Sequence, residues 1–353
     1  MSFKKIFSPA ASIIKIFILI LILSLSTKAD ENNIKYYSND KGILPLMYHR
    51  FDEKRYPSTN IQMDVFKEQV KIIKNLNFDF YNPGDLNKEF LLAKKEKKIL
   101  ITIDDAFSSF YDVAWPYLKK EKIPFILFVS TEAIGKNGYM SWEQIKLIEK
   151  ESNAYIGNHS HSHEYLVNFK NKDFIKDIIT ANKIFIDNLG YNPIFFSYPF
   201  GEYSNSIKKY ISENFKFAFG QHSGVIDINK NRYELPRFPI NEKYGDLKRF
   251  KFLINLYPLE FKNLLPKEKY LTEVNNPPKF SVEFFKEQKN LNNINCFSDA
   301  GDNWKKANIN FNKDILYINF REQFNYRRGR INCSLNDNGI WRWFGVQFSI
   351  KQG

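Results

Sequence analysis

"KILITIDDAFSSFY" occupies residues 98–111 and holds a strand-like apolar run with two acidic residues directly after it. Residues 98–104 are typical of a buried strand, and a helix is expected near residues 111–120. Two carboxylates beside a core are costly unless they are paired or bind a cation. The alternative is a polar turn that caps the next helix, which Asp does well. Asp104 and Asp105 are therefore candidate functional residues at the end of a strand.

The same alternation of strand and helix extends in both directions from this stretch. Repeated units of this kind imply parallel strands that are covered by helices. We therefore predict an α/β domain, a distorted (β/α) barrel, over residues 30–245. The further strands are expected at 43–49, 123–129, 153–159, 194–201 and 217–220, and the further helices at 63–76, 141–150, 173–190 and 204–214.

Polar or turn residues stand at the ends of four of the expected strands. They are His49, the Asp104–Asp105 pair, His159 and the segment 199–201. In a barrel of parallel strands the carboxyl ends converge on one face, where active sites form. We therefore expect these four stretches to meet at one pocket.

The segment "NHSHSH" (158–163) contains three of the five histidines of the chain, at positions 159, 161 and 163. A strand would place all three on one face, whereas a tight turn or a first helical turn would bring His159 and His163 together. Either geometry converges neutral imidazoles, which are good ligands for a transition metal. The alternative is a solvated polar loop. Because two carboxylates follow another strand, we favour a metal site.

The pattern changes after about residue 275. Short aromatic and β-branched segments separated by turn residues are typical of a small all-β domain, such as a sandwich. We predict a β-rich accessory domain over residues 277–353, joined to the first domain by a linker over 246–276. Its expected strands lie at 277–285, 314–320, 329–335 and 341–350.

The N-terminus has the pattern of a secretory signal peptide. Lys4 and Lys5 give a basic start, residues 16–25 are apolar except for Ser24, and "STKAD" (26–30) supplies small residues for cleavage. We predict a signal peptide over residues 1–29 and a secreted or periplasmic protein; an uncleaved N-terminal anchor is the alternative, and the one route to membrane association.

The two cysteines, Cys296 and Cys333, both lie in the predicted β-rich domain. A cysteine pair in an exported protein can form a disulfide. The sequence does not give the separation of the two residues in space, so the bonded and the free forms both stay open.

The formal net charge is +13. The positive residues are spread along the chain, and no concentrated basic stripe stands beside a nucleic-acid-binding motif. The densest cluster, "YRRGR" (326–330), is best explained as a solvated loop. We expect no nucleic-acid partner.

Three motifs, "TIDDAFSSFY", "NHSHSH" and "FFSYPFG", together resemble the polysaccharide deacetylase family, carbohydrate esterase family 4, over roughly residues 43–245. The resemblance implies that Asp104 is the general base, and that Asp105, His159 and His163 hold one divalent metal. His161 would face another way. A mixed imidazole and carboxylate ligand set admits several metals, with zinc expected first and nickel, cobalt or manganese as alternatives.

These residues suit the hydrolysis of an acetamide, which is a poor electrophile. A metal with three protein ligands and one open position lowers the pKa of bound water from ~15.7 towards ~7 and polarises the acetyl carbonyl. One Asp can then hold the cation while its neighbour accepts the proton of the water. The amine product needs a proton to leave, so a general acid is also required.

The chain departs from the common family pattern at two points. Ser197 stands where the family often has Arg, and the usual late Leu-x-His that supplies the acid is absent. However, "LMYHRF" (46–51) and "ELPRF" (234–238) resemble the branch that deacetylates β-1,6-linked N-acetylglucosamine polymers of biofilms. That resemblance gives the acid role to His49, and Arg237 would orient Asp104 and keep it ionised. The alternatives are a structural role for His49, His222 as the acid, and a surface ion pair for Arg237.

We therefore expect a secreted, metal-dependent hydrolase that removes N-acetyl groups from an amino-sugar polysaccharide. The alternatives are an O-acetyl esterase or small-amide hydrolase on the same fold, and a non-catalytic carbohydrate-binding protein. The four intact motif residues argue against a dead site. Two sets of residues are expected to contact sugar: Tyr198 and Phe200 in the third motif, and Trp304, Trp341 and Trp343 in the β-rich domain, where core packing is the alternative.

Overall fold

The structure is a computed structural model of the chain, and it describes residues 42–89, 98–151, 153–227 and 230–352. The signal peptide predicted for residues 1–29 lies outside the described residues. Among the helices that are described, none has the length and apolarity that a membrane crossing requires.

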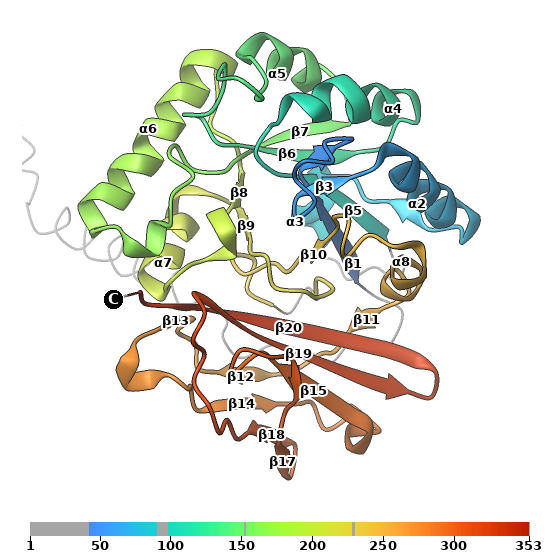
Figure 1. The fold of residues 1–353 in the computed structure, drawn as a ribbon, viewed down its shortest axis with the longest axis vertical. Coiled ribbons are helices and arrows are strands. Elements are labelled where there is room, and N and C mark those ends of the chain that lie inside the picture. Colours follow the sequence, from blue (N-terminus) through green and yellow to red (C-terminus); the bar gives the residue numbers. More distant parts are fainter. Residues whose placement is uncertain (1–41, 90–97, 152, 228–229, 353) are drawn as a thin grey trace, which may run out of the picture. The chain divides into compact units, whose positions relative to one another are not determined.

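The first domain is built on a parallel sheet with the spatial order β10-β1-β5-β6-β7-β8-β9, and β4 pairs with β5 (Figure 1). Each paired strand in it runs parallel to its neighbour. The predicted α/β fold with a barrel-like parallel sheet is therefore confirmed. The strands are β1 (Ile43–Tyr48), β4 (Asp79–Phe80), β5 (Lys98–Ile103), β6 (Phe125–Val129), β7 (Ala154–Asn158), β8 (Phe195–Ser197), β9 (Phe217–Phe219) and β10 (Phe238–Pro239).

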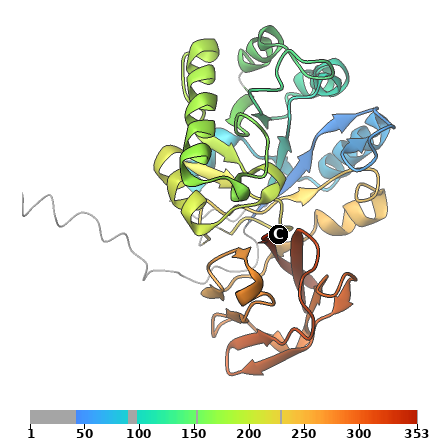
Figure 2. The same cartoon turned by 60° about the vertical axis from the view of Figure 1, so that its left-hand side comes forward.

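Helices cover the outer face of this sheet (Figures 1 and 2). Local sequence signals explain their ends: Ser141 and Gln144 form a reciprocal capping box at the start of α5, and Gly190 ends α6 at φ 82°. The helices are α2 (Met63–Asn75), α3 (Leu86–Glu89), α4 (Trp115–Lys120), α5 (Trp142–Glu149), α6 (Asn171–Leu189), α7 (Asn205–Asn214) and α8 (Leu247–Leu253). Shorter elements are β2 (Arg50–Phe51), β3 (Asn60–Ile61), η1 (Pro83–Asp85), η2 (Phe110–Ala114), η3 (Leu166–Asn168) and η4 (Pro199–Gly201).

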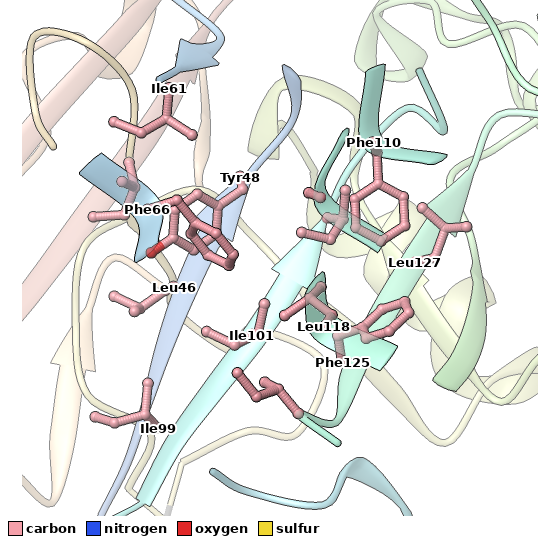
Figure 3. Packing of buried hydrophobic residues seen from close by; sticks show 14 of the residues in the cluster. Leu46, Tyr48, Ile61, Phe66, Ile99, Ile101, Phe110, Leu118, Phe125 and Leu127 are labelled. Atoms are coloured by element: carbon pink, nitrogen blue, oxygen red, sulfur yellow. The ribbon is translucent and has the colours of Figure 1, made fainter. Parts of the chain in front are cut away.

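The central strands are buried on both faces, which explains their unbroken apolar runs. One face packs against the helices, as Figure 3 shows for Leu46 and Tyr48 of β1, Ile99 and Ile101 of β5, and Phe125 and Leu127 of β6. Side chains on the opposite face of the sheet form a second buried cluster, which includes Leu100, Ile126, Phe128, Phe195 and Phe219.

The segment 232–237 brings the two edges of the parallel sheet together. It runs beside β9, where Ala218 N donates to Arg232 O at 2.9 Å and Gly220 N donates to Leu235 O at 2.8 Å. It then continues into β10, which pairs with β1. Arg237 therefore enters the interior between the first and last strands of the sheet.

The C-terminal part forms two β-sheets around a shared core that includes Val282, Leu316, Leu335 and Phe344. The larger sheet contains β11 (Tyr257–Pro258), β20 (Ile340–Ile350), β19 (Arg328–Asp337), β15 (Ile294–Ser298), β16 (Lys305–Lys306) and β13 (Tyr270–Leu271). The smaller one contains β12 (Asn263–Leu265), β14 (Phe280–Glu283), β18 (Ile315–Ile318) and β17 (Ile309–Asn312). Two short helical turns, η5 (Glu273–Asn275) and η6 (Leu291–Asn293), lie between strands.

The segment 246–276, which the sequence analysis treats as a linker, is largely structured. It contains α8, and its short strands β11 and β13 pair with β20 while β12 pairs with β14. The β-sheets therefore take in residues from Tyr257 onward, before the expected start at residue 277. Strands of two or three residues are too short to give a periodic sequence signal.

Cys296 and Cys333 form a disulfide across the paired strands β15 and β19, where they stand directly opposite each other. Both residues are fully buried in the sandwich core. The bond closes a loop with a sequence separation of 37 residues.

Replacing both cysteines by Ala is expected to lower the free energy of unfolding by about 3–4 kcal/mol, because the cross-link no longer restricts the unfolded chain. Urea unfolding followed by tryptophan fluorescence measures the change. The wild-type protein under a reducing agent serves as the control and should unfold at a similarly reduced urea concentration. Superimposable unfolding curves for oxidised and reduced wild type would contradict the expectation.

Candidate active site

The four stretches that the sequence analysis singled out meet at the carboxyl ends of the parallel strands. His49 follows β1, Asp104 and Asp105 follow β5, and His159 follows β7. The Nε2 atoms of His49 and His159 lie 4.0 and 3.8 Å from Asp104 Oδ2. Phe200, after β8, lines the same cavity as His49 and Asp105.

Tight turns after the strands aim these side chains at one point. Asp105, Ser160, His163 and Phe200 all have positive φ, at 75°, 68°, 54° and 59°. Such values are uncommon for residues other than glycine and cost roughly 1–3 kcal/mol each. Four of them within one site indicate that the fold holds these turns against their local preference.

Asp105, His159 and His163 form a cluster whose ligand atoms lie within 4.8 Å of one another. Asp105 Oδ1 is 3.4 Å from His159 Nε2 and 3.1 Å from His163 Nε2. The turn therefore brings the first and third histidines together. His161 points elsewhere, where its Nδ1 lies 2.9 Å from Thr131 Oγ1.

The cluster fits a divalent cation. His159 Nδ1 lies 2.7 Å from Ser197 O, and since a carbonyl can only accept, Nδ1 carries the proton and Nε2 presents a lone pair. Within the described residues, His159 Nε2 and Asp105 Oδ1 are buried atoms with no hydrogen-bond partner. Buried acceptors are normally satisfied, and a cation between two imidazoles and a carboxylate would satisfy these.

Asp104 makes a bidentate ion pair with Arg237. The two guanidinium nitrogens lie 2.6 and 2.9 Å from the two carboxylate oxygens, and both side chains are fully buried. Arg237 Nη2 also donates to Ser197 Oγ at 2.8 Å. The interpretation of Arg237 as a surface ion pair is therefore wrong, and its guanidinium lies against the Ser197 that stands where an Arg was expected.

The charge of Asp104 follows from this pairing. Burial alone would raise its pKa, but the Arg237 guanidinium, with smaller contributions from His159 and His49, holds the pKa below its usual value. Burial would also raise the pKa of Asp105, but the neighbouring His159 and His163 hold it well below the usual value. Both carboxyl groups are therefore ionised at neutral pH.

Two histidines line the cavity as candidates for the general acid, His49 and His222. Burial lowers the pKa of His49, although the carboxylates of Asp105 and Asp104 oppose that change. Burial lowers the pKa of His222 to about 4, so this ring carries almost no proton at neutral pH. His49 also lies near Asp104, and the geometry therefore favours it.

The third motif contributes one aromatic side chain to the cavity, not two. Phe200 lines it, with its ring 4.8 Å from the His163 ring and stacked on Tyr165 at 4.1 Å. Tyr198 is fully buried, and its hydroxyl donates to Tyr233 O at 3.1 Å. The predicted role of Tyr198 in substrate binding is therefore wrong, because its side chain belongs to the core between sheet and helices.

Strands of the β-sandwich form the opposite wall of this cavity, which has a volume of about 830 Å³. All the described residues belong to one compact unit. The sequence does not predict this wall, because the side-chain pattern of one domain does not reveal which surface a second domain covers. The contributing residues are Phe297, Trp304, Arg328, Arg330, Asn332, Trp343, Val346 and Gln347.

The sandwich also holds the turn that carries Phe200. Gln347 Nε2 donates to Phe200 O at 3.0 Å, and Arg327 Nε lies 3.1 Å from the buried Glu202 Oε1. The Arg327 guanidinium carbon lies 3.4 Å from the centre of the Tyr165 ring, on which Phe200 stacks. Residues of the C-terminal β-rich part therefore hold the strained turn beside His163 in place.

The three tryptophans of the β-rich segment differ in their surroundings. Trp341 and Trp343 pack against the core of the first domain, at 5.6 Å from Phe252 and 6.3 Å from Phe238 between ring centres. Core packing is therefore the better account of these two, although Trp343 also borders the cavity. Trp304 is 45% exposed.

Comparisons with known proteins relate the first domain to one family. The family model described as polysaccharide deacetylase matches residues 92–216. The poly-beta-1,6-N-acetyl-D-glucosamine N-deacetylase of Staphylococcus aureus (strain MSSA476) is 26% identical over 273 residues, which cover 65% of this chain and 92% of that protein.

Two solved structures share the fold. IcaB from Ammonifex degensii has a TM-score of 0.54 at 23% identity and covers 61% of this chain and 97% of its own. The Streptococcus pyogenes deacetylase PplD in complex with acetate has a TM-score of 0.53 at 21% identity, covering 58% and 95%.

The matched segment contains the ionised Asp104 and the Asp105, His159 and His163 cluster. The Staphylococcus aureus relative is by its name a polysaccharide N-deacetylase, a hydrolase acting on carbon–nitrogen bonds. Residues 92–216 of this chain therefore match the polysaccharide deacetylase family.

Proposed function

We propose that this protein is a secreted, metal-dependent polysaccharide N-deacetylase that acts on β-1,6-linked N-acetylglucosamine polymer. One observation carries the proposal: the buried, ionised Asp104–Arg237 pair lies directly beside a three-residue cluster with unsatisfied ligand atoms. The substrate follows from the Staphylococcus aureus relative, whose name gives that polymer.

Asp105, His159 and His163 would hold the divalent metal, with zinc first and nickel, cobalt or manganese as alternatives. Such a cation supplies Lewis-acid polarisation of the acetyl carbonyl and lowers the pKa of a bound water. The lone pair of His159 Nε2 is fixed in place by the bond from Nδ1 to Ser197 O. The protein thus orients this ligand before any cation arrives.

The remaining residues move protons. Asp104 takes a proton from the water whose oxygen adds to the acetyl carbon, and Arg237 keeps Asp104 ionised until then. His49 gives a proton to the amide nitrogen as the carbon–nitrogen bond breaks, which releases acetate and a free amine. Arg237 acts on the reaction through Asp104, since it contacts that carboxylate with both terminal nitrogens.

Export is the second part of the proposal. The predicted signal peptide over residues 1–29 supports it, and so does the disulfide, because such bonds persist in oxidising compartments. Sequencing of the N-terminus of protein recovered outside the cytoplasm should begin at Asp30. Recovery of the whole chain from the cytoplasm alone would refute export and leave the enzymatic proposal standing.

The enzymatic proposal is tested with protein stripped of metal and then reloaded with each of the four metals in turn. Release of free amine from a β-1,6-linked N-acetylglucosamine pentamer is the readout, with an O-acetylated sugar and a small acetamide as comparison substrates. We expect amine release that requires metal and exceeds hydrolysis of both comparison substrates. Higher activity on the O-acetyl ester would favour the esterase alternative, and oligomer binding without hydrolysis would favour the non-catalytic one.

His49→Ala is expected to lower kcat by ~10²–10⁴-fold without loss of metal, because the leaving amine loses its proton donor. The acid acts only while protonated, so activity falls as the pH rises through its pKa. Burial lowers the pKa of His49, so this fall should begin at a lower pH than for an exposed histidine. In His49→Ala the fall should vanish.

The pH–rate profiles of wild type, His49→Ala and His222→Ala test this assignment. If activity no longer decreased at high pH in His222→Ala but still decreased in His49→Ala, the acid role would belong to His222.

A further inference from the structure

One face of the larger β-sheet borders the cavity that contains the metal cluster. Along β19 the side chains alternate: Arg328, Arg330 and Asn332 line the cavity, whereas Ile331 and Cys333 point into the sandwich core. Alternation of this kind is ordinary for a sheet with one solvated face. The solvated face is unusual because it lies across from His49, Asp105 and His163.

Two exposed aromatic rings lie on this face. Phe297 is 43% exposed, and in the register of β15 and β19 it stands opposite Asn332. Trp304, directly before β16, is 45% exposed. Both line the cavity. Large apolar side chains that are exposed together at a cavity mark a binding surface more often than scattered ones do.

Arg330 is held on this face by Asp299 and lies near the Trp304 ring. Its Nε donates to Asp299 Oδ2 at 2.9 Å, and its backbone N donates to Asp299 Oδ1 at 2.6 Å. Asp299 is only 6% exposed, and the Arg330 guanidinium carbon lies 5.6 Å from the centre of the Trp304 ring. A charged group held in place on an aromatic ring loses little freedom when a ligand binds.

The position of this surface relative to the metal cluster follows from the strand order. β20 touches the first domain, since a Cβ at Gly345 would lie 2.3 Å from Ser223 O. β19 is the next strand outward and β15 the one after, at about 4.8 Å per strand. The surface therefore begins at the domain contact and extends away from it. The whole cavity, at about 830 Å³, is near the upper end of the roughly 300–1,000 Å³ usual for ligand pockets.

We propose that Trp304, Arg330 and Phe297 form a sugar-binding subsite for a second N-acetylated unit of the same polymer chain that reacts at the metal cluster. This inference rests on the proposed function. A flat aromatic ring packs on the apolar C–H face of a pyranose, and a guanidinium donates to hydroxyl or acetamide oxygens. The cations of Arg328 and Arg330 repel an ammonium group, so the subsite takes the neutral, acetylated unit and disfavours a deacetylated one.

Trp304→Ala in the full chain tests the subsite. Trp304 is the suitable position because its side chain is exposed, whereas loss of the Arg330 side chain would leave the buried Asp299 without its charged partner. Phe311→Ala is the matched control, since Phe311 is 37% exposed on β17 of the other sheet and does not line the cavity. The probes are β-1,6-linked N-acetylglucosamine dimer and pentamer.

Wild type should have a lower KM for the pentamer than for the dimer. Trp304→Ala should raise the KM for the pentamer about five- to tenfold, as truncation of a contact aromatic does, and so remove most of its advantage over the dimer. Phe311→Ala should match wild type on both. If the ratio of the KM for the pentamer to the KM for the dimer were the same in wild type and Trp304→Ala, the subsite would be overturned. The deacetylase proposal would still stand.

Direct binding separates the two proposals if no substrate is hydrolysed. Calorimetric titration of wild type and Trp304→Ala with the acetylated pentamer should show the same five- to tenfold weakening. A fully deacetylated glucosamine pentamer should bind wild type more weakly than the acetylated one at low ionic strength. Equal affinity of Trp304→Ala and wild type for the acetylated pentamer, or tighter binding of the deacetylated one, would overturn the inference.

Discussion

Asp104→Asn is expected to lose deacetylation by ~10²–10⁴-fold while its metal content stays at the wild-type level. The amide has the shape of the carboxylate and can still accept a hydrogen bond from Arg237. It cannot accept a proton from water. Because Asp104 is ionised at neutral pH and lies 3.8 Å from His159 Nε2, the loss should appear in kcat, which steady-state release of amine from the pentamer measures.

The control for this variant is a test of whether it still folds. Asn leaves the buried Arg237 without a counter-charge, and breaking one partner of a buried ion pair costs about 3–5 kcal/mol of stability. Thermal melting and metal analysis of the same sample separate unfolding from lost chemistry. A folded, metal-loaded Asp104→Asn protein with near wild-type turnover would show that Asp104 is not the base.

His163→Ala is expected to lose metal and activity together. Two of the three cluster ligands, Asp105 and His159, remain. Loss of a direct ligand should weaken binding by more than the roughly 10–100-fold that loss of an outer partner costs. The side chain of His163 is 29% exposed, so its removal should leave the fold intact. Elemental analysis after dialysis against a weak chelator measures the metal content.

His161→Ala is the matched control for the ligand assignment. His161 lies two residues before His163 in the same turn, and its ring contacts Thr131 Oγ1 and not the cluster. It should retain its metal. Full metal occupancy in His163→Ala, or equal loss in both variants, would show that the alternation of the three histidines had been assigned wrongly.

The sequence predicts the first domain well because its signals are local. The apolar run of β5, the capping box of α5 and the glycine that ends α6 each specify an element through neighbouring residues. The carboxyl ends of parallel strands then place distant motifs together without any further information. The placement of Asp104 beside His159 follows from those two steps.

Other parts depend on contacts that the sequence does not express as a pattern. Tyr198 and Phe200 belong to the same motif, yet one points into the core and the other into the cavity. The strands β11 to β13 are too short for a periodic signal. Arg330 and Gln347 reach the cavity because two surfaces more than a hundred residues apart in the chain fit together, and such a fit depends on shape.

The strand β20 is the last strand of the chain to be synthesised. Residues 42–245, which carry every proposed proton donor, proton acceptor and metal ligand, leave the ribosome first, and β20 is complete only at Ile350. At roughly 5–20 residues per second, translation of the intervening hundred residues takes about 5–20 seconds. Until β20 has been made, the chain lacks the part of the cavity wall that Trp343, Val346 and Gln347 provide. A chain that stops before Ile340 would lack this wall permanently.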